Sequence, residues 1–169
     1  MGMFTVNDLR AESKQEFYRS LVEQVRHLMA GETNELANLS NVAALLNMHL
    51  KEINWVGFYL WYEAEQTLIL GPFQGKPACI RITEGRGVCG TAAKSRQTQV
   101  VPDVLMFPGH IACDPDSRSE IVIPMVKAGR LVGVLDIDSP RTQRFDADDA
   151  AGLQQVVDVL LEGTEFLDR

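Results

Sequence analysis

Residues 120–138 read EIVIPMVKAGRLVGVLDID and carry the clearest structural signal in the chain. Two apolar runs, at 120–127 and 131–138, flank the short segment Ala128-Gly129-Arg130. Runs of this length that are rich in Val and Ile, and are joined by a few residues containing Gly, are typical of a β-hairpin. The stretch therefore predicts two neighbouring antiparallel strands.

The same stretch predicts a cluster of carboxylates. Asp136 and Asp138 are two residues apart, so both side chains point to one face of the strand. If residues 127 and 131 close a three-residue loop, Glu120 lies directly opposite Asp138, whereas a two-residue loop reverses the parity and separates them. Carboxylates that close cannot all stay ionised away from water, so at least one pKa should rise and provide a general acid at neutral pH. The alternative is a strand that ends in solvent, with Asp138 capping a plain turn.

The sequence before and after the hairpin predicts further helices and strands. Ser13-Lys14-Gln15-Glu16 is a capping box that opens an N-terminal helix, which Gly31 stops. Thr33 is expected to cap a second helix, and Asp146 a final one. Between them, residues 53–62 (INWVGFYLWY) are apolar on both faces and predict a central strand. The remaining expected elements are strands at 67–70, 79–83 and 99–102 and a short helix at 88–95.

The order of these elements predicts the fold class. Hairpins follow one another along the chain and helices stand at both ends. This order favours an α+β fold with an antiparallel sheet of about six strands and helices packed mainly on one face. The 169 residues fit a single domain at 13–169, preceded by a loosely held N-terminal tail at 1–12.

Composition excludes several classes of partner. The formal net charge of −7 repels nucleic-acid backbones and acidic membrane surfaces, so we expect no nucleic-acid partner and no membrane partner. No stretch approaches the roughly 20 apolar residues that span a bilayer, and the start MGMFTV lacks the basic segment and long apolar run of a signal peptide. A cytoplasmic protein is expected, and the sequence leaves monomer and homodimer open.

Cys113 has the most reactive setting of the three cysteines in the chain. It lies in the aperiodic segment 103–119, and loops of that length are usually functional or disordered. His110, three residues earlier, would favour a thiolate when protonated, whereas the neighbouring Asp114 would oppose one. The alternative is an incidental loop cysteine.

The other two cysteines admit more than one interpretation. Cys89 falls in the first turn of the expected short helix, where the helix N-terminus would lower the pKa of a thiol, but the position also suits close packing. Cys79 begins an expected strand and belongs to the core by default. Because the number of cysteines is odd and the compartment reducing, no structural disulfide framework is expected. A Cys₃His zinc site that includes His110 would have spacings that match no standard finger, so no metal is expected.

Aromatic side chains crowd the expected central strand. Trp55, Tyr59 and Trp61 alternate onto one face of it. Strand aromatics usually fill the core, but some of these three could instead wall a pocket for a small apolar group.

Six segments taken together resemble one known family. They are INWVGFY at 53–59, LGPFQGK at 70–76, GRGVCGT at 85–91, GHIACD at 109–114, SEIV at 119–122 and GVLDIDS at 133–139. The combination is similar to the free methionine-(R)-sulfoxide reductases, a family built on the GAF domain, and it extends from the first helix to the last. The LDIDS strand by itself would indicate only a GAF domain.

The resemblance implies a function and a site. The substrate would be free L-methionine (R)-sulfoxide and the electron donor thioredoxin, with no metal or organic cofactor. The Cys113 thiolate would attack the sulfoxide sulfur while Glu120 or Asp138 protonates the leaving oxygen, and the resulting sulfenic acid would condense with a second cysteine. The resemblance leaves both Cys79 and Cys89 open for that second role. We prefer Cys79, because the loop carrying Cys113 could fold over it at the sheet edge.

The family's binding residues match Trp55, Tyr59, Glu120, Asp136 and Asp138.

Two other functions are alternatives to the reductase activity. GAF domains often bind small ligands for regulation, and a reactive cysteine pair could serve as a redox sensor without catalysis.

Overall fold

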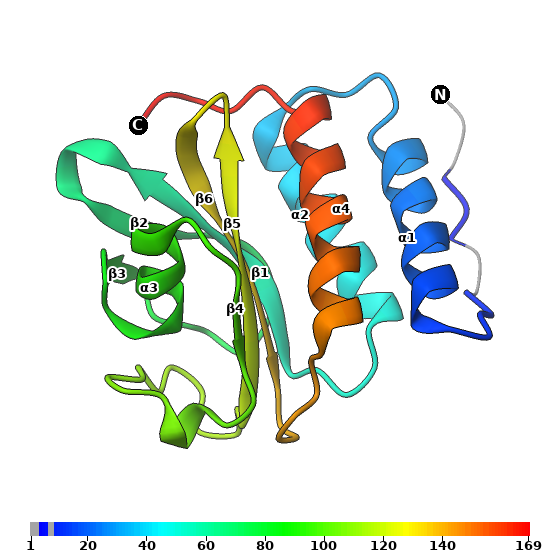
Figure 1. Ribbon diagram of the computed structural model, residues 1–169. Helices are drawn as coiled ribbons and strands as arrows, with labels where there is room; N and C mark the ends of the chain where they lie inside the picture. The colour runs from blue at the N-terminus through cyan, green and yellow to red at the C-terminus, as the bar shows by residue number, and fades with distance from the viewer. Residues whose placement is uncertain (1–3, 7–8) are drawn as a thin grey trace.

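The computed structural model describes residues 4–6 and 9–169, and within them it contains four α-helices and one six-stranded sheet (Figure 1). The helices are α1 (Lys14–Leu28), α2 (Glu35–His49), α3 (Gly87–Ser95) and α4 (Ala147–Gly163). The strands are β1 (Trp55–Tyr62), β2 (Thr67–Gly75), β3 (Arg81–Thr83), β4 (Gln99–Val101), β5 (Ser119–Lys127) and β6 (Arg130–Ser139). Their order in the sheet is β3-β2-β1-β6-β5-β4, and every neighbouring pair is antiparallel, which confirms the predicted α+β class.

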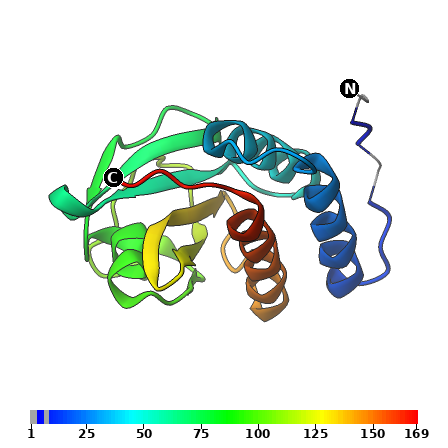
Figure 2. The same cartoon turned by 90° about the horizontal axis from the view of Figure 1, so that it is seen from above.

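The helices divide unequally between the two faces of the sheet. Figure 1 shows α1, α2 and α4 together on one face and α3 on the other, and the view from above in Figure 2 agrees. Each face has its own apolar core. The core under α1, α2 and α4 includes Val56, Phe58, Ile121, Leu135 and Ile137 from the strands. The core under α3 includes Trp55, Tyr59, Trp61, Val122 and Val134. The helices thus lie mainly on one face, as predicted, and α3 leaves the rest of the second face for a site.

The turn of the β5–β6 hairpin differs from the prediction. Lys127 pairs with Arg130, so the loop holds two residues, and Ala128 and Gly129 have φ of 50° and 80°. Positive φ at both central positions is the type I′ turn that fits the twist of a hairpin. The three-residue loop is therefore wrong.

The predicted register nevertheless holds, because a second irregularity compensates for the shorter loop. Met125 pairs with Gly133 and Val126 with Leu131, so β6 carries one extra residue at this point. A β-bulge of this kind shifts the register by one residue. Beyond it, Glu120 lies opposite Asp138, as the carboxylate argument required.

The β2–β3 region also departs from the predicted boundaries. β2 continues to Gly75 because residues 73–75 still pair with β1. β3 begins at Arg81, so Cys79 lies in the preceding loop and not in a strand. This difference matters for the site, because a loop cysteine can approach another loop.

Helix starts follow the capping signals with one exception. Ser13 Oγ accepts a hydrogen bond from the backbone N–H of Glu16, and Asp146 forms a reciprocal capping box at the start of α4. The cap of α2 is Asn34, whose side chain accepts from the N–H of Ala37, so the expectation for Thr33 is wrong. Among the described residues, no helix is both long and apolar enough to cross a bilayer.

The expected N-terminal tail, residues 1–12, lies partly outside the described residues, which begin with 4–6 and resume at 9. Within the described part, Phe4, Val6 and Leu9 pack against the core under α1, α2 and α4.

Candidate active site

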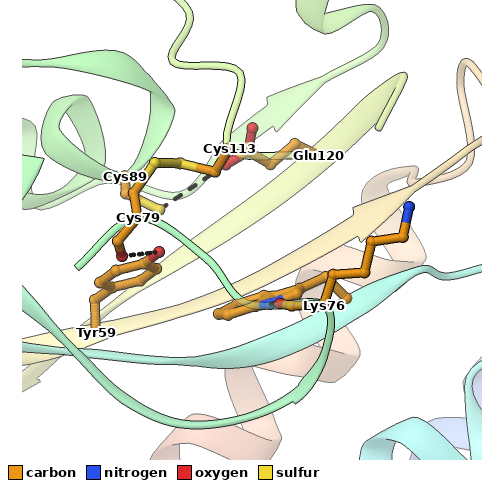
Figure 3. The surroundings of a disulfide bond; sticks show 7 residues. Tyr59, Lys76, Cys79, Cys89, Cys113 and Glu120 are labelled. Carbon is orange, nitrogen blue, oxygen red and sulfur yellow. Dashed lines mark hydrogen bonds between the residues drawn. A yellow bond between two sulfur atoms is a disulfide. The ribbon is translucent and has the colours of Figure 1, made fainter. Parts of the chain in front are cut away.

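A disulfide joins two loops above the second face of the sheet. Cys79, in the loop before β3, is bonded to Cys113, in the loop before β5, and their Cα atoms are 5.5 Å apart (Figure 3). This separation lies in the usual range for a disulfide. The pairing is the one preferred on the sequence. The loop that contains Cys113 therefore folds over the sheet edge near β3.

A pocket lies directly beneath this disulfide. Its free volume is about 40 Å³, which holds two or three water molecules but no amino acid. Its lining comes from β1, β3, β5, β6, the start of α3 and the two cysteine loops. It includes Trp55, Tyr59, Lys76, Ile82, Arg86, Cys89, His110, Cys113, Asp114, Ser117, Glu120, Asp136 and Asp138. The site residues predicted from the sequence thus line one cavity, except Cys79, which is bonded to the lining residue Cys113.

Three carboxylates form the polar side of the pocket. Glu120 and Asp136 are 5% and 6% exposed, and Asp138 is half-buried beside them. They converge because Glu120 pairs with Asp138 across β5 and β6, and Asp136 lies two residues before Asp138 on the same face of β6. The alternative of a strand end in solvent is wrong, since the strand continues to Ser139 and the carboxylates are covered.

Burial raises the pKa of each carboxyl group, and repulsion from neighbouring carboxylates adds to it at Glu120 and Asp138. Loss of water is the main cause of the raised pKa of Glu120, and the charges of Asp136 and Asp138 add to it. Burial raises the pKa of Asp136 to about 6. The pKa of Asp138 rises through burial, then through Asp136 and Asp114. At neutral pH the cluster therefore holds at least one proton that it can donate.

Cys89 is the free cysteine, and it lies beside these carboxylates rather than near solvent. It is 4% exposed, and its Sγ is 3.9 Å from Oε1 of Glu120, a contact drawn in Figure 3. Burial raises the pKa of the Cys89 thiol, and the charges of Asp136 and Glu120 raise it further. The prediction that the N-terminus of α3 lowers this pKa is therefore wrong, because burial and adjacent acids outweigh the helix end.

Polar contacts hold the Cys113 loop in place. Asp114 Oδ2 accepts a hydrogen bond of 3.0 Å from Nδ2 of Asn54, which also donates to Oγ of Ser117. Lys76 Nζ lies 3.6 Å from Oδ1 of Asp114. A hydrogen bond from the N–H of Asp116, with help from Asn54 and Lys76, lowers the pKa of Asp114. Sequence reasoning missed Asn54 and Lys76 as site residues, although both fall inside the quoted segments.

His110 does not supply the positive charge that the sequence suggested. Its pKa is lowered by burial, so the imidazole is neutral at pH 7 in this disulfide form. Within the part of the chain that the structure describes, its Nδ1 is buried without a hydrogen-bond partner.

Aromatic rings form the apolar side of the pocket. Trp55 stacks on Tyr59 with ring centroids 5.9 Å apart and on Phe73 at 5.2 Å. The Tyr59 hydroxyl donates a 3.0 Å hydrogen bond to the carbonyl oxygen of Cys79, and Nε1 of Trp55 donates to that of Lys76. These two rings therefore both wall the pocket and fix the loop that carries Cys79. Trp61 shares their face, but its Nε1 donates to Glu63 outside the pocket.

The buried acids should destabilise the fold at neutral pH. The folded-state pKa of Asp136, about 6, lies above its usual 3.8, so the folded chain binds this proton more tightly than the unfolded chain. The resulting stabilisation is complete below about pH 3.8 and is lost as the pH rises through about 6. Asp136→Asn should therefore raise the free energy of unfolding by on the order of 1–3 kcal/mol at pH 7.5, and by much less at pH 4.

Urea unfolding of both proteins at the two pH values measures this difference. Asp158→Asn on the exposed side of α4 is the matched control, with no pH-dependent gain expected. An equal loss of stability in Asp136→Asn at both pH values would contradict the burial argument.

Comparison with known proteins agrees with this geometry. Residues 15–160 match the family model of the GAF domain. The chain is 54% identical over 145 residues to the free methionine-R-sulfoxide reductase of Escherichia coli (strain K12), which covers 86% of this chain and 87% of the relative. The structure of free methionine-R-sulfoxide reductase from Neisseria meningitidis in complex with its substrate has a TM-score of 0.91 at 43% identity and covers 95% of both chains. The reduced form of fRMsr of Staphylococcus aureus has a TM-score of 0.83 at 52% identity, covering 86% of this chain and 94% of that chain.

Proposed function

Because the chain belongs to the GAF-domain free methionine-R-sulfoxide reductases, we propose that its pocket reduces free L-methionine (R)-sulfoxide to methionine. The observation that carries the proposal is the Cys79–Cys113 disulfide beside a pocket lined by carboxyl groups whose pKa values burial raises. A thiol pair supplies the two electrons, and an acid supplies the proton that a leaving oxygen needs.

The first step uses Cys113 as the nucleophile. Its thiolate attacks the sulfoxide sulfur, the sulfur–oxygen bond breaks, and the oxygen passes to Cys113 as a sulfenic acid while methionine departs. The sulfoxide sulfur is reduced by two electrons and the cysteine sulfur is oxidised by two. Glu120 is the proposed proton donor to the oxygen, with Asp138 as the second candidate. Glu120 is preferred because it is the more deeply buried of the two.

The second step closes the disulfide seen here. The Cys79 thiol attacks Sγ of Cys113, and the sulfenic oxygen leaves as water. The Cα atoms of Cys79 and Cys113 are 5.5 Å apart, the usual separation across a disulfide, whereas Cys89 forms a disulfide with neither of them. Thioredoxin then restores both thiols by thiol–disulfide exchange.

We place this cycle in the cytoplasm. A homodimer stays a prediction that analytical ultracentrifugation would test.

Trp55 and Tyr59 are the proposed binding surface for the apolar end of the substrate. Their stacked rings lie beside the carboxylates on the same face of the sheet, where Trp55 pairs with Asp138 across β1 and β6, so a sulfur bearing a methyl group would place its carbon on the rings and its oxygen toward the acids. Asp136 and Asp138 are proposed to bind the polar groups of the free amino acid.

A coupled assay tests the whole cycle. The protein, free methionine sulfoxide, thioredoxin, thioredoxin reductase and NADPH should together oxidise NADPH continuously and form methionine in equal amount. A protein that forms the Cys79–Cys113 disulfide with an oxidant but makes no methionine would instead be a redox-sensing module.

Replacing the resolving cysteine should separate the two steps. Cys79→Ser should form one methionine per enzyme and then stop, because the sulfenic acid on Cys113 has no partner with which to condense. Cys89→Ser is the matched variant and should continue to turn over with thioredoxin. Methionine is counted by chromatography, and the sulfenic acid is trapped with a dimedone probe. If Cys79→Ser turns over normally while Cys89→Ser stalls, the role belongs to Cys89.

A further inference from the structure

Cys89 is left without a chemical role by the proposed cycle, although it lies within the pocket. Its Sγ, a carboxylate oxygen of Glu120 and a carboxylate oxygen of Asp136 all lie within 4.8 Å of one another, and all three side chains are buried. We propose that these three groups form a binding site for one thiophilic divalent cation of the Zn²⁺ class.

An unsatisfied acceptor on one of the three groups is a second observation that points to a ligand here. Asp136 is 6% exposed and lines the pocket, yet within the described residues its Oδ1 has no hydrogen-bond partner. A buried carboxylate oxygen with no partner is costly, and a metal ion directly satisfies such an oxygen.

The geometry suits an ion better than it suits any larger ligand in this form. The pocket beneath the disulfide offers about 40 Å³, enough for an ion with one or two water molecules. Zinc binds thiolate sulfur at about 2.3 Å and carboxylate oxygen at about 2.0–2.2 Å. The sulfur and the two oxygens therefore need to move closer to one another by roughly 1 Å when the ion binds. Three protein ligands plus one water complete a tetrahedral shell.

The donor set also selects the class of ion. A thiolate excludes Mg²⁺ and Ca²⁺, which take oxygen ligands, and favours Zn²⁺, Co²⁺ or Cd²⁺. Binding displaces the protons that Cys89 and the acids carry, so affinity rises with pH and protons are released. An ion held there would fill the space that the substrate needs and inhibit the enzyme. That consequence rests on the proposed function, whereas the binding does not.

Cobalt binding to the oxidised protein tests the site without any activity measurement. With Cys79 and Cys113 bonded to each other, Cys89 is the remaining thiol, and a thiol titration of one per chain verifies that state. Adding Co²⁺ should produce a thiolate-to-cobalt charge-transfer band in the near ultraviolet, and Zn²⁺ should abolish it by displacement.

Two variants and one control assign the ligands. Cys89→Ser, verified as folded by circular dichroism, should lack the band. Asp136→Asn should keep the band but bind Co²⁺ at least about tenfold more weakly, and Asp158→Asn should match the wild type. Oxidised wild-type protein without the band at saturating Co²⁺ would overturn the proposal. A band that persists in Cys89→Ser, or an affinity that Asp136→Asn leaves unchanged, would overturn it equally.

Discussion

Replacing Cys113 with serine should abolish the formation of even one methionine per enzyme. The reaction needs a sulfur that can attack the sulfoxide and keep its oxygen, and a serine hydroxyl does neither at neutral pH. In a single-turnover experiment without reductant, the reduced wild type should form one methionine per chain, whereas Cys113→Ser should form none.

Two variants make this result specific. Cys89→Ser should keep the full single-turnover yield, and Cys79→Ser should keep it while failing to recycle. If Cys113→Ser still forms one methionine per chain, Cys113 is not the nucleophile, and Cys89 becomes the leading alternative because it lines the same pocket.

Replacing Glu120 with glutamine should lower kcat by roughly a hundredfold or more. Glutamine preserves the shape of the side chain but cannot transfer a proton to the leaving oxygen, and a positioned general acid contributes about this much. Burial raises the pKa of Glu120, so the acid form persists at neutral pH and is lost only as the pH rises through that raised value. The wild-type rate should therefore fall on the alkaline side, and Glu120→Gln should lack this decrease.

A surface variant serves as the control, and Asp138 is the competing proton donor. Glu162→Gln, on an exposed position of α4, should leave kcat and the pH profile unchanged. If Glu120→Gln retains the wild-type rate while Asp138→Asn loses it together with the alkaline decrease, the proton donor is Asp138.

Much of the fold follows from local sequence signals. The Val- and Ile-rich runs of β5 and β6, the apolar run of β1 and the caps at Ser13 and Asp146 each express a short-range preference that the tertiary structure keeps. The hairpin shows how such reasoning can reach the right register through a wrong turn. A two-residue turn and a bulge within β6 together give the pairing that a three-residue loop would have given.

The properties of the site depend on contacts that no local signal contains. The α3 start at Cys89 favours a lower thiol pKa by itself, but burial against Glu120 and Asp136 reverses the direction. His110 looks cationic next to Cys113 in the sequence, yet burial keeps it neutral. Asn54 and Lys76 hold the Cys113 loop from segments about 60 and about 40 residues earlier in the chain, and only the folded structure brings them there.

The most direct test of the account is the activity of the reduced wild type on separated substrates. The free R epimer, the free S epimer and a peptide containing methionine (R)-sulfoxide are each incubated with the enzyme, and the sulfoxide consumed is measured by chromatography. The account predicts one equivalent consumed for the free R epimer and none for the other two, because the small pocket under the cysteine loops leaves no room for a peptide chain and the preference for the R epimer is the one named for the family. No consumption of the free R epimer, or equal consumption of the peptide, would contradict it.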